Sequence, residues 1–301
     1  MRSPLEFRRR GGGSFDIAST NPSAYYDRTN LATLFQDRAG TTPVTAGSQP
    51  IGLGLDQSQG LVLGAELAGN PGGPFINTSE WYDTQGNAPL TVDGGMLAAT
   101  PTTTAPSRTE TLFPTVTGEW YLFQCNVDQF SGAGETLAIL TSSNGGIVPG
   151  TVVIGTTGTC KQMFKATTAS TYVTIGSNIS TIGVPNKIVS LSVKLLAGNH
   201  QLQSTAGKRP ITDGSPIYAN FDAVDDDLVA VFPASLGAGC TVCRSLPGTG
   251  ASITTGVTLT ATYTDNVDAH ALLIYTAAQW ASLDAGQIAN ITTWLNGRAG
   301  L

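Results

Sequence analysis

Hydrophobic and polar positions alternate most clearly over residues 118–127, where the sequence reads GEWYLFQCNV. Successive side chains of a strand point to opposite faces of its sheet. The alternation therefore predicts one face that is apolar throughout and one that starts apolar and ends polar. The first face holds Tyr121, Phe123, Cys125 and Val127, and the second holds Trp120, Leu122, Gln124 and Asn126. We expect the first face to pack in a core and the second to meet solvent or a ligand.

A second alternating run covers residues 188–195 and predicts a half-buried antiparallel strand. Its expected core side chains are Val189, Leu191, Val193 and Leu195. Shorter β-branched or aromatic runs are separated by clusters of Gly, Ser, Asn and Pro, and they lie at residues 136–140, 151–154, 160–164 and 171–175. Short strands at such spacing are typical of a β-sandwich or barrel.

One helix is predicted near the C-terminal end of the chain. Apolar positions there follow the i, i+3, i+4, i+7 spacing of a helix that packs on a core, at Ile288, Ile291, Thr292 and Leu295. Asp284 and Gln287 form a predicted capping box, and Gly297 is the expected stop. Trp294 lies one position off the apolar stripe and is expected to lock the helix end, with a contact to a partner as the alternative.

Composition and charge narrow the class of protein. The chain has 301 residues, enough for two ordinary domains, and 12% of them are charged, against about 25% in an average soluble protein. The net charge of −6 disfavours nucleic acid as the main partner, because binding a polyanion needs a basic surface. No apolar run approaches the ~20 residues that span a bilayer, so we expect no membrane insertion.

The first thirteen residues form a basic arm that lacks the apolar stretch of a secretory signal. Their charged residues are Arg2, Arg8, Arg9 and Arg10 against Glu6, and three glycines follow as a flexible spacer. Such a segment buries too little apolar surface to fold alone. It is either a disordered tail or an anchor that orders against an acidic or pore-like surface of a partner protein.

The four cysteines do not indicate a metal site. Cys240 and Cys243 have the spacing of half a zinc ribbon, but a second half is missing and the chain has two histidines. We expect no metal and no cofactor. The cysteines are interpreted as small buried hydrophobic residues, and a bridge between Cys125 and Cys160 across neighbouring strands stays open as the alternative.

Catalytic patterns are weak. His200 and His270 are the candidate bases, and neither lies in a GxSxG motif. Glycosidases need two carboxyl groups about 5 to 9 Å apart, but no spacing singles out a pair from Glu119, Asp128, Glu135 and the acidic residues near position 225. We therefore expect a protein that is not an enzyme.

Two groups of residues are candidate binding sites. The acidic run Asp222, Asp225, Asp226 and Asp227 suits either a tight turn, which we favour, or a calcium site. Aromatic residues with polar neighbours suit carbohydrate, because a ring stacks on the apolar face of a sugar while polar groups hold its hydroxyls. The candidates are Trp81, Tyr82, Asp83 and Trp120. The alternative is that Trp81 and Trp120 complete a core.

Residues 14–60 read SFDIASTNPSAYYDRTNLATLFQDRAGTTPVTAGSQPIGLGLDQSQG. This stretch resembles the opening of concanavalin-like (laminin-G-like) modules in tail and fibre proteins of bacteriophages. The resemblance resumes at GNHQLQSTAGKRPI (residues 198–211), at FDAVDDDL (221–228) and in the ending from ALLIY (271–275) to WLNGRAGL (294–301). The interruption implies that residues 14–70 and 197–301 form one sandwich with an insertion at residues 71–196.

The insertion carries FINTSEWYDTQGNAPLTVDGGMLAAT and TGEWYLFQCNVDQFSG, which resemble jelly-roll carbohydrate-binding modules. The resemblance implies an all-β fold of two jelly-roll or concanavalin-like sandwiches, one inserted in the other, with one C-terminal helix. It also implies that the protein is a subunit of a tail fibre, or of a head or tail spike, on a phage-like particle. That particle is either a bacteriophage or a gene transfer agent, and it is assembled in the bacterial cytoplasm.

In this interpretation the basic arm, residues 1–13, attaches to other particle proteins, and the β modules bind a host-surface polysaccharide such as capsule. A particle subunit is expected to be a homo-oligomer, a trimer or pentamer, because closed symmetry is the rule for soluble oligomers. The alternatives are a polysaccharide depolymerase of a tailspike and a free carbohydrate-binding adhesion module.

Overall fold

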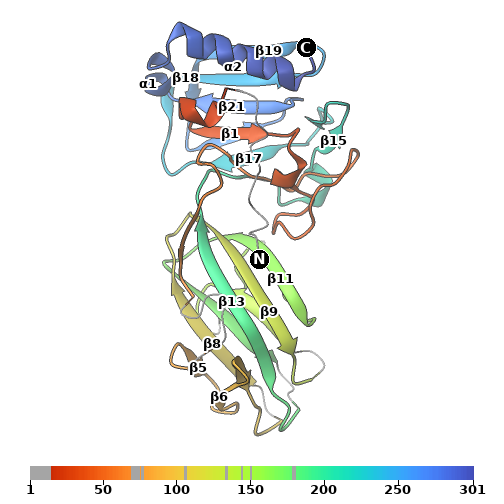
Figure 1. Ribbon diagram of the computed structural model, residues 1–301, viewed down its shortest axis with the longest axis vertical. Coiled ribbons are helices and arrows are strands. Elements are labelled where there is room, and N and C mark those ends of the chain that lie inside the picture. Colours follow the sequence, from red (N-terminus) through yellow and green to blue (C-terminus); the bar gives the residue numbers. More distant parts are fainter. Residues whose placement is uncertain are drawn as a thin grey trace.

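The computed structural model describes residues 15–68, 75, 78–104, 107–132, 135–143, 145–149, 151–177 and 181–301. Figure 1 shows an elongated molecule with two lobes placed end to end. Antiparallel strands make up most of both lobes, and the longer of two helices lies near the C-terminal end. The prediction of an all-β fold with a C-terminal helix is confirmed.

The lower lobe in Figure 1 is a β-sandwich of two sheets. One sheet has the strand order β10-β12-β8-β5, and the other has the order β11-β9-β13-β7-β6, with β4 paired to β13. The strands are β4 (Leu63–Glu66), β5 (Trp81–Asp83), β6 (Leu90–Asp93), β7 (Met96–Ala99), β8 (Ser107–Pro114), β9 (Trp120–Gln129), β10 (Thr136–Leu140), β11 (Gly158–Lys165), β12 (Ser170–Ser177) and β13 (Asn186–Leu196).

The core of this sandwich is built by alternation along its strands. The predicted apolar face of β9, formed by Tyr121, Phe123, Cys125 and Val127, is buried there together with side chains from both sheets. Tyr121 stacks on Phe164 with ring centroids 5.5 Å apart. Burying apolar area contributes about 25 cal/mol per Å², so the burial of this shared face stabilises the sandwich.

Two details of the strand prediction were wrong. The register of β13 against β9 shifts between Ile188 and Ser190, so Ile188 rather than Val189 points into the core. A bulge adds one residue to a strand and reverses the faces on one side of it. The run at residues 151–154 forms no strand, and Ile154 makes an isolated bridge with Leu137.

The upper lobe contains strands from both ends of the chain. Its sheets have the orders β1-β21-β18-β19 and β2-β3-β14-β17-β20, with a separate pair β15-β16. The strands are β1 (Ala24–Asp27), β2 (Leu34–Phe35), β3 (Leu53–Gly54), β14 (Gln201–Leu202), β15 (Ile211–Asp213), β16 (Tyr218–Asn220), β17 (Leu228–Val231), β18 (Gly237–Leu246), β19 (Gly250–Leu259), β20 (Thr262–Asp265) and β21 (Ala271–Tyr275).

The sheet pairing crosses the middle of the sequence. β1 pairs with β21, and β3 pairs with β14. β4 lies before residue 70 but pairs with β13 of the lower lobe. The division of the chain into residues 1–13, 14–70 with 197–301, and 71–196 stays a prediction.

Helix α2 (Ala285–Arg298) covers the sheet of β1, β21, β18 and β19 (Figure 1). The predicted capping box is present, since Asp284 accepts from the Gln287 backbone N–H and Gln287 accepts from that of Asp284. Ile291 and Leu295 are buried against this sheet. A shorter helix, α1 (Ala277–Ala281), starts at Thr276 with its own capping box and was not predicted. Short 3-10 turns, η1 (Ile17–Thr20), η2 (Leu31–Thr33) and η3 (Ala206–Lys208), complete the elements.

None of the helices in the described ranges is long and apolar enough to cross a membrane.

The two lobes meet in a core of their own. It contains Leu53 of the upper lobe and Trp120, Leu122 and Met163 of the lower lobe, among others. Gly40 makes this approach possible, because its φ is +66° and an added Cβ would lie 3.0 Å from the Met163 methyl carbon. The lobes therefore share buried apolar surface at the junction.

The chain passes between the lobes twice, at residues 55–62 and 197–200, and Asp56 ties the two passages together. Its carboxylate accepts the backbone N–H of Tyr25 (2.9 Å), of Ser58 (2.9 Å) and of Asn199 (2.7 Å). The Asp56 N–H donates to Nδ1 of His200 at 2.9 Å. We call Asp56 with these partners the Asp56 clasp.

Candidate functional site

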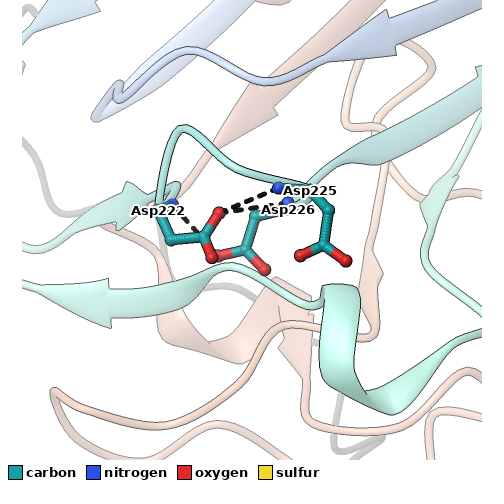
Figure 2. Close-up of side chains that lie close together, drawn as sticks. All are labelled: Asp222, Asp225 and Asp226. Carbon is teal, nitrogen blue, oxygen red and sulfur yellow. Dashed lines mark hydrogen bonds between the residues drawn. The ribbon is translucent and has the colours of Figure 1, made fainter.

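The acidic loop after β16 is a turn held by its own carboxylates (Figure 2). Oδ1 of Asp222 accepts the backbone N–H groups of Val224, Asp225 and Asp226 at 2.9, 3.2 and 3.3 Å. The Asp222 N–H in turn donates to Oδ2 of Asp226 at 3.2 Å. Asp side chains that bond the backbone in this way are favoured in tight turns.

The charges of this loop also have partners nearby. Lys208 Nζ lies 3.7 Å from Asp225, and Gln203 donates to Asp227. The backbone N–H groups hold the pKa of Asp222 below its ordinary value, whereas burial and the neighbouring carboxylates raise that of Asp226. Oxygens of Asp222, Asp225 and Asp226 lie within 4.8 Å of one another, but the hydrogen bonds of the turn account for the cluster, and we assign no ion to it.

The four predicted carbohydrate-binding residues are not brought together. Trp81 is 6% exposed and belongs to the core of the lower sandwich. Trp120 is 3% exposed and lies in the core between the lobes. Asp83 ends β5 and accepts the backbone N–H groups of Gln85, Gly86 and Ala88. Of the two tryptophans, neither offers an exposed ring.

Tyr82 differs, because its side chain is 40% exposed. It alternates with Trp81 and Asp83 on β5 and therefore points away from the sandwich core. Register places Tyr82 opposite Glu110 of β8, which lies opposite Thr174 of β12. Leu112 of β8, 45% exposed, lies opposite Tyr172, so side chains of three strands share this outward surface. We call Tyr82, Glu110, Leu112, Tyr172 and Thr174 the tyrosine face.

The tyrosine face has a buried polar floor. Glu110 is fully buried, and the Ser143 hydroxyl donates to its carboxylate at 2.7 Å. The Thr174 hydroxyl is buried and has no hydrogen-bond partner among the described residues. Partial burial raises the pKa of the Tyr82 phenol, and the negative charges that Tyr172 and Glu110 can carry raise it further. The Tyr82 phenol is therefore neutral at physiological pH and available as a hydrogen-bond donor.

This arrangement places ring surface beside hydroxyl groups that can donate and accept. Tyr82 and Leu112 supply solvent-exposed apolar surface, and Tyr172 lies partly buried next to them. Ser143 adds an exposed hydroxyl that Glu110 holds in place. Flat apolar surface with oriented polar groups is what a sugar ring requires of a binding protein.

Sequence reasoning missed Glu110, Leu112 and Tyr172. Tyr172 lies in the predicted run 171–175, whereas the strand that carries Glu110 and Leu112 was not predicted. Neither strand could be assigned as part of the sheet that contains β5, because strand order depends on contacts between segments far apart in the sequence. The signal that could have found them is alternation in SRTETLFP (β8), where Glu110 and Leu112 alternate with Thr111 and Phe113.

Three of the other candidate acids and bases are buried in structural contacts. Glu135 is buried and accepts from Ser131 (2.5 Å) and Asn186 (3.3 Å). His200 is buried at the junction, and burial lowers its pKa to about 3. His270 is buried beside Tyr218, with ring centroids 5.3 Å apart. The arginines of the predicted anchor, Arg2, Arg8, Arg9 and Arg10, lie outside the described residues.

The cysteines are free thiols. Cys125, Cys240 and Cys243 are buried, and Cys160 is partly buried. Cys125 of β9 and Cys160 of β11 lie directly opposite each other in register. The hydrogen bond with Cys160 raises the pKa of the Cys125 thiol, and burial raises it further.

No protein-family model matches the chain, and no curated protein matches it in sequence. Among solved structures, the chain is similar to a xanthan lyase from Paenibacillus, with 12% sequence identity and a TM-score of 0.24. That match covers 78% of this chain and 26% of the lyase chain, so the chain spans about a quarter of the length of that protein.

Proposed function

We propose that this protein is a fibre or spike subunit of a phage-like particle, and that its tyrosine face binds a glycan of the host surface. The observation that carries the binding proposal is the exposed Tyr82 ring beside Leu112 and Tyr172 on an outward sheet face. Exposed apolar groups that gather on one face mark interaction sites more often than scattered ones do. In this proposal the protein binds the glycan without cleaving it.

Burial makes the tyrosine face a rigid platform. The face is built on β5, β8 and β12, whose opposite sides pack in the sandwich core. Sites on strands are held more firmly than sites on loops. A platform that is already ordered loses little conformational entropy when it binds a sugar.

The particle assignment rests on the sequence resemblance to tail and fibre proteins. In this proposal the basic arm anchors the subunit through charge-assisted contacts of its arginines with acidic groups of another particle protein. The subunit would form a closed trimer or pentamer on the particle surface.

The glycan proposal is tested by binding of the purified full chain to capsulated and capsule-free bacterial cells. We expect binding to the capsulated cells and a drop of up to about tenfold in affinity for Tyr82→Ala, since an aromatic contact is worth ~0.5–1.5 kcal/mol. Tyr82→Phe keeps the ring and should retain most of the affinity. Val224→Ala, which shortens an exposed apolar side chain of the upper lobe, is the control.

Equal binding by Tyr82→Ala, Tyr172→Ala and the unchanged protein would remove the tyrosine face from the proposal. Equal binding to capsulated and capsule-free cells would contradict the proposal that the protein binds capsule glycan.

The particle proposal has its own experiment. A chain without residues 1–13 should fold and bind cells like the full chain but should be missing from purified particles. Incorporation at the normal level would contradict the anchor.

A further inference from the structure

A groove follows the junction of the two lobes. It consists of two adjoining cavities of about 540 and 380 Å³ that share Asn199, Phe232 and Pro233. Cavities of such size lie in the range of ligand-binding clefts, and such clefts occur preferentially between domains. We call the two cavities together the junction groove.

The lower wall of the groove continues from the tyrosine face. Val116 and Glu119, in the turn that follows β8, line the smaller cavity together with Lys165 at the end of β11. Val116 is 62% exposed. The strand that carries Glu110 and Leu112 on the tyrosine face therefore leads directly into the groove.

Alternation keeps one row of β8 side chains on the outside along this path. Glu110, Leu112 and Pro114 share the outward side, and Leu112 and Pro114 are exposed. Val116 lies four positions after the exposed Leu112, which corresponds to ~13 Å of extended chain at about 3.3 Å per residue. Exposed surface thus runs from the tyrosine face to the junction groove over a length greater than that of one sugar ring.

The groove presents side chains that suit hydroxyl groups. Gln59 at the upper cavity and Glu119 at the lower cavity accept hydrogen bonds, whereas Lys165 donates. Gln279 also lines the upper cavity, and its carbonyl oxygen is held in place by the Ser23 hydroxyl and the Thr276 N–H. The lower cavity thus offers a carboxylate and an ammonium group, the upper cavity offers amides, and together they match a ligand rich in hydroxyls and ring oxygens.

We infer that the tyrosine face and the junction groove form one track, which binds a linear polysaccharide along its length rather than at a chain end. This inference rests on the proposed function, since the tyrosine face supplies the first contact. A sugar chain long enough to extend from the tyrosine face into the groove should then bind more tightly than a shorter one. The reason is that, once one part of the chain is bound, the second contact forms at high effective concentration.

The probe is a size-graded set of fragments of capsular polysaccharide, extracted from the cells that the protein binds and titrated by calorimetry. Short fragments should bind through the tyrosine face, and longer fragments should bind at least tenfold more tightly. Thr117→Trp places a large side chain in the mouth of the lower cavity, where Thr117 is exposed. Thr255→Trp, at an exposed position of β19, is the matched control.

The inference predicts that Thr117→Trp binds short fragments normally but loses the gain with length, whereas the control keeps it. Tyr82→Ala should weaken binding of every fragment. If short and long fragments bind the unchanged protein equally, or if Thr117→Trp retains the gain, the track is wrong while the proposed glycan function stands. If no fragment binds, both fall.

Discussion

The indole ring of Trp120 and the imidazole of His200 meet edge to face across the junction of the lobes. Their centroids lie 5.4 Å apart with an angle of 67° between the ring planes. Trp120 comes from β9 of the lower sandwich, and His200 comes from the passage into the upper lobe. Edge-to-face pairs at such a distance add ~0.5–1.5 kcal/mol beyond the burial of their area.

Trp120→Ala should destabilise the protein by about 3–5 kcal/mol, as the loss of a buried indole leaves a cavity. It should also loosen the two lobes against each other. Trp81→Ala is the matched control, because Trp81 is equally buried but lies within the lower sandwich. Denaturant unfolding measures the first effect, and small-angle scattering measures the second. An unchanged scattering profile for Trp120→Ala would contradict the role of this core in fixing the lobes.

Arg28→Met should cost about 3–5 kcal/mol of unfolding free energy, because it leaves the carboxylate of Asp265 buried with less compensation. Arg28 is 1% exposed and pairs with Asp265, which also lies 3.4 Å from Arg244. Lys187→Met is the control, since the Lys187–Asp93 pair is at the surface, where solvent screening leaves an ion pair little net effect on stability. An equal loss of unfolding free energy in the two variants would show that the buried ion pair is no more important for stability than the surface pair.

The stability of the protein should fall as the pH drops from 6.5 towards 3. Burial lowers the pKa of His200 from its ordinary 6.5 to about 3, so in this window the unfolded state binds more protons and stability is lost as pH decreases. The slope from this group is at most about 1.4 kcal/mol per pH unit. Its neutral Nδ1 accepts from the Asp56 N–H, and protonation would break that bond.

Unfolding free energies of the unchanged protein and of His200→Asn across this pH range isolate the effect. Asp56 acts in the opposite sense, because burial raises its pKa and the folded state then holds its proton more firmly. The variant should show a flatter profile between pH 6.5 and 3. The same slope in both proteins would mean that His200 does not titrate in this way.

Cys125 and Cys160 should form a disulfide when the protein is treated with a small disulfide oxidant such as oxidised glutathione. Directly opposite residues of antiparallel strands have Cα atoms ~4.5–5.5 Å apart, within the ~4.4–6.8 Å that a disulfide needs. Two thiols are oxidised and the reagent is reduced to two thiols. Mass spectrometry of peptides should find this bridge and no bridge that involves Cys240 or Cys243.

The oxidised protein should also resist denaturant better, by about 3–4 kcal/mol in the chain-entropy estimate. Cys160→Ser is the control and should show no gain. Mixed disulfides with glutathione alone, without an internal bridge, would contradict the register.

Strand β9 was predicted almost completely. The apolar positions of residues 121–127 lie in the core because strand geometry alone fixes which side chains share a face. Helix α2 was predicted as well, since its capping box and its stripe at Ile291 and Leu295 are local features, but it continues past the expected stop at Gly297 to Arg298. The bulge at residues 188–190 could not be foreseen, because it depends on how β13 pairs with β9.

The candidate site shows the same limit. Tyr82 was selected from its local pattern and is exposed, but Trp120 was selected from the same pattern and is buried by Leu53 and Phe35 of a distant segment. The mixed face of β9 was expected to meet solvent or a ligand, and its apolar half meets the other lobe instead. A short stretch of sequence cannot show whether a side chain is buried by residues that are far away in the sequence.

The Asp56 clasp has a mechanical consequence. Two passages of chain cross the junction, and they are bonded to each other, both through Asp56 and through the Ala197 N–H to the Val62 carbonyl at 3.5 Å. A pull that separates the lobes is therefore shared by two segments of polypeptide, which cross the junction in opposite directions. A molecule held at one lobe and loaded at the other should yield first within a lobe, where strands can peel from sheet edges one at a time.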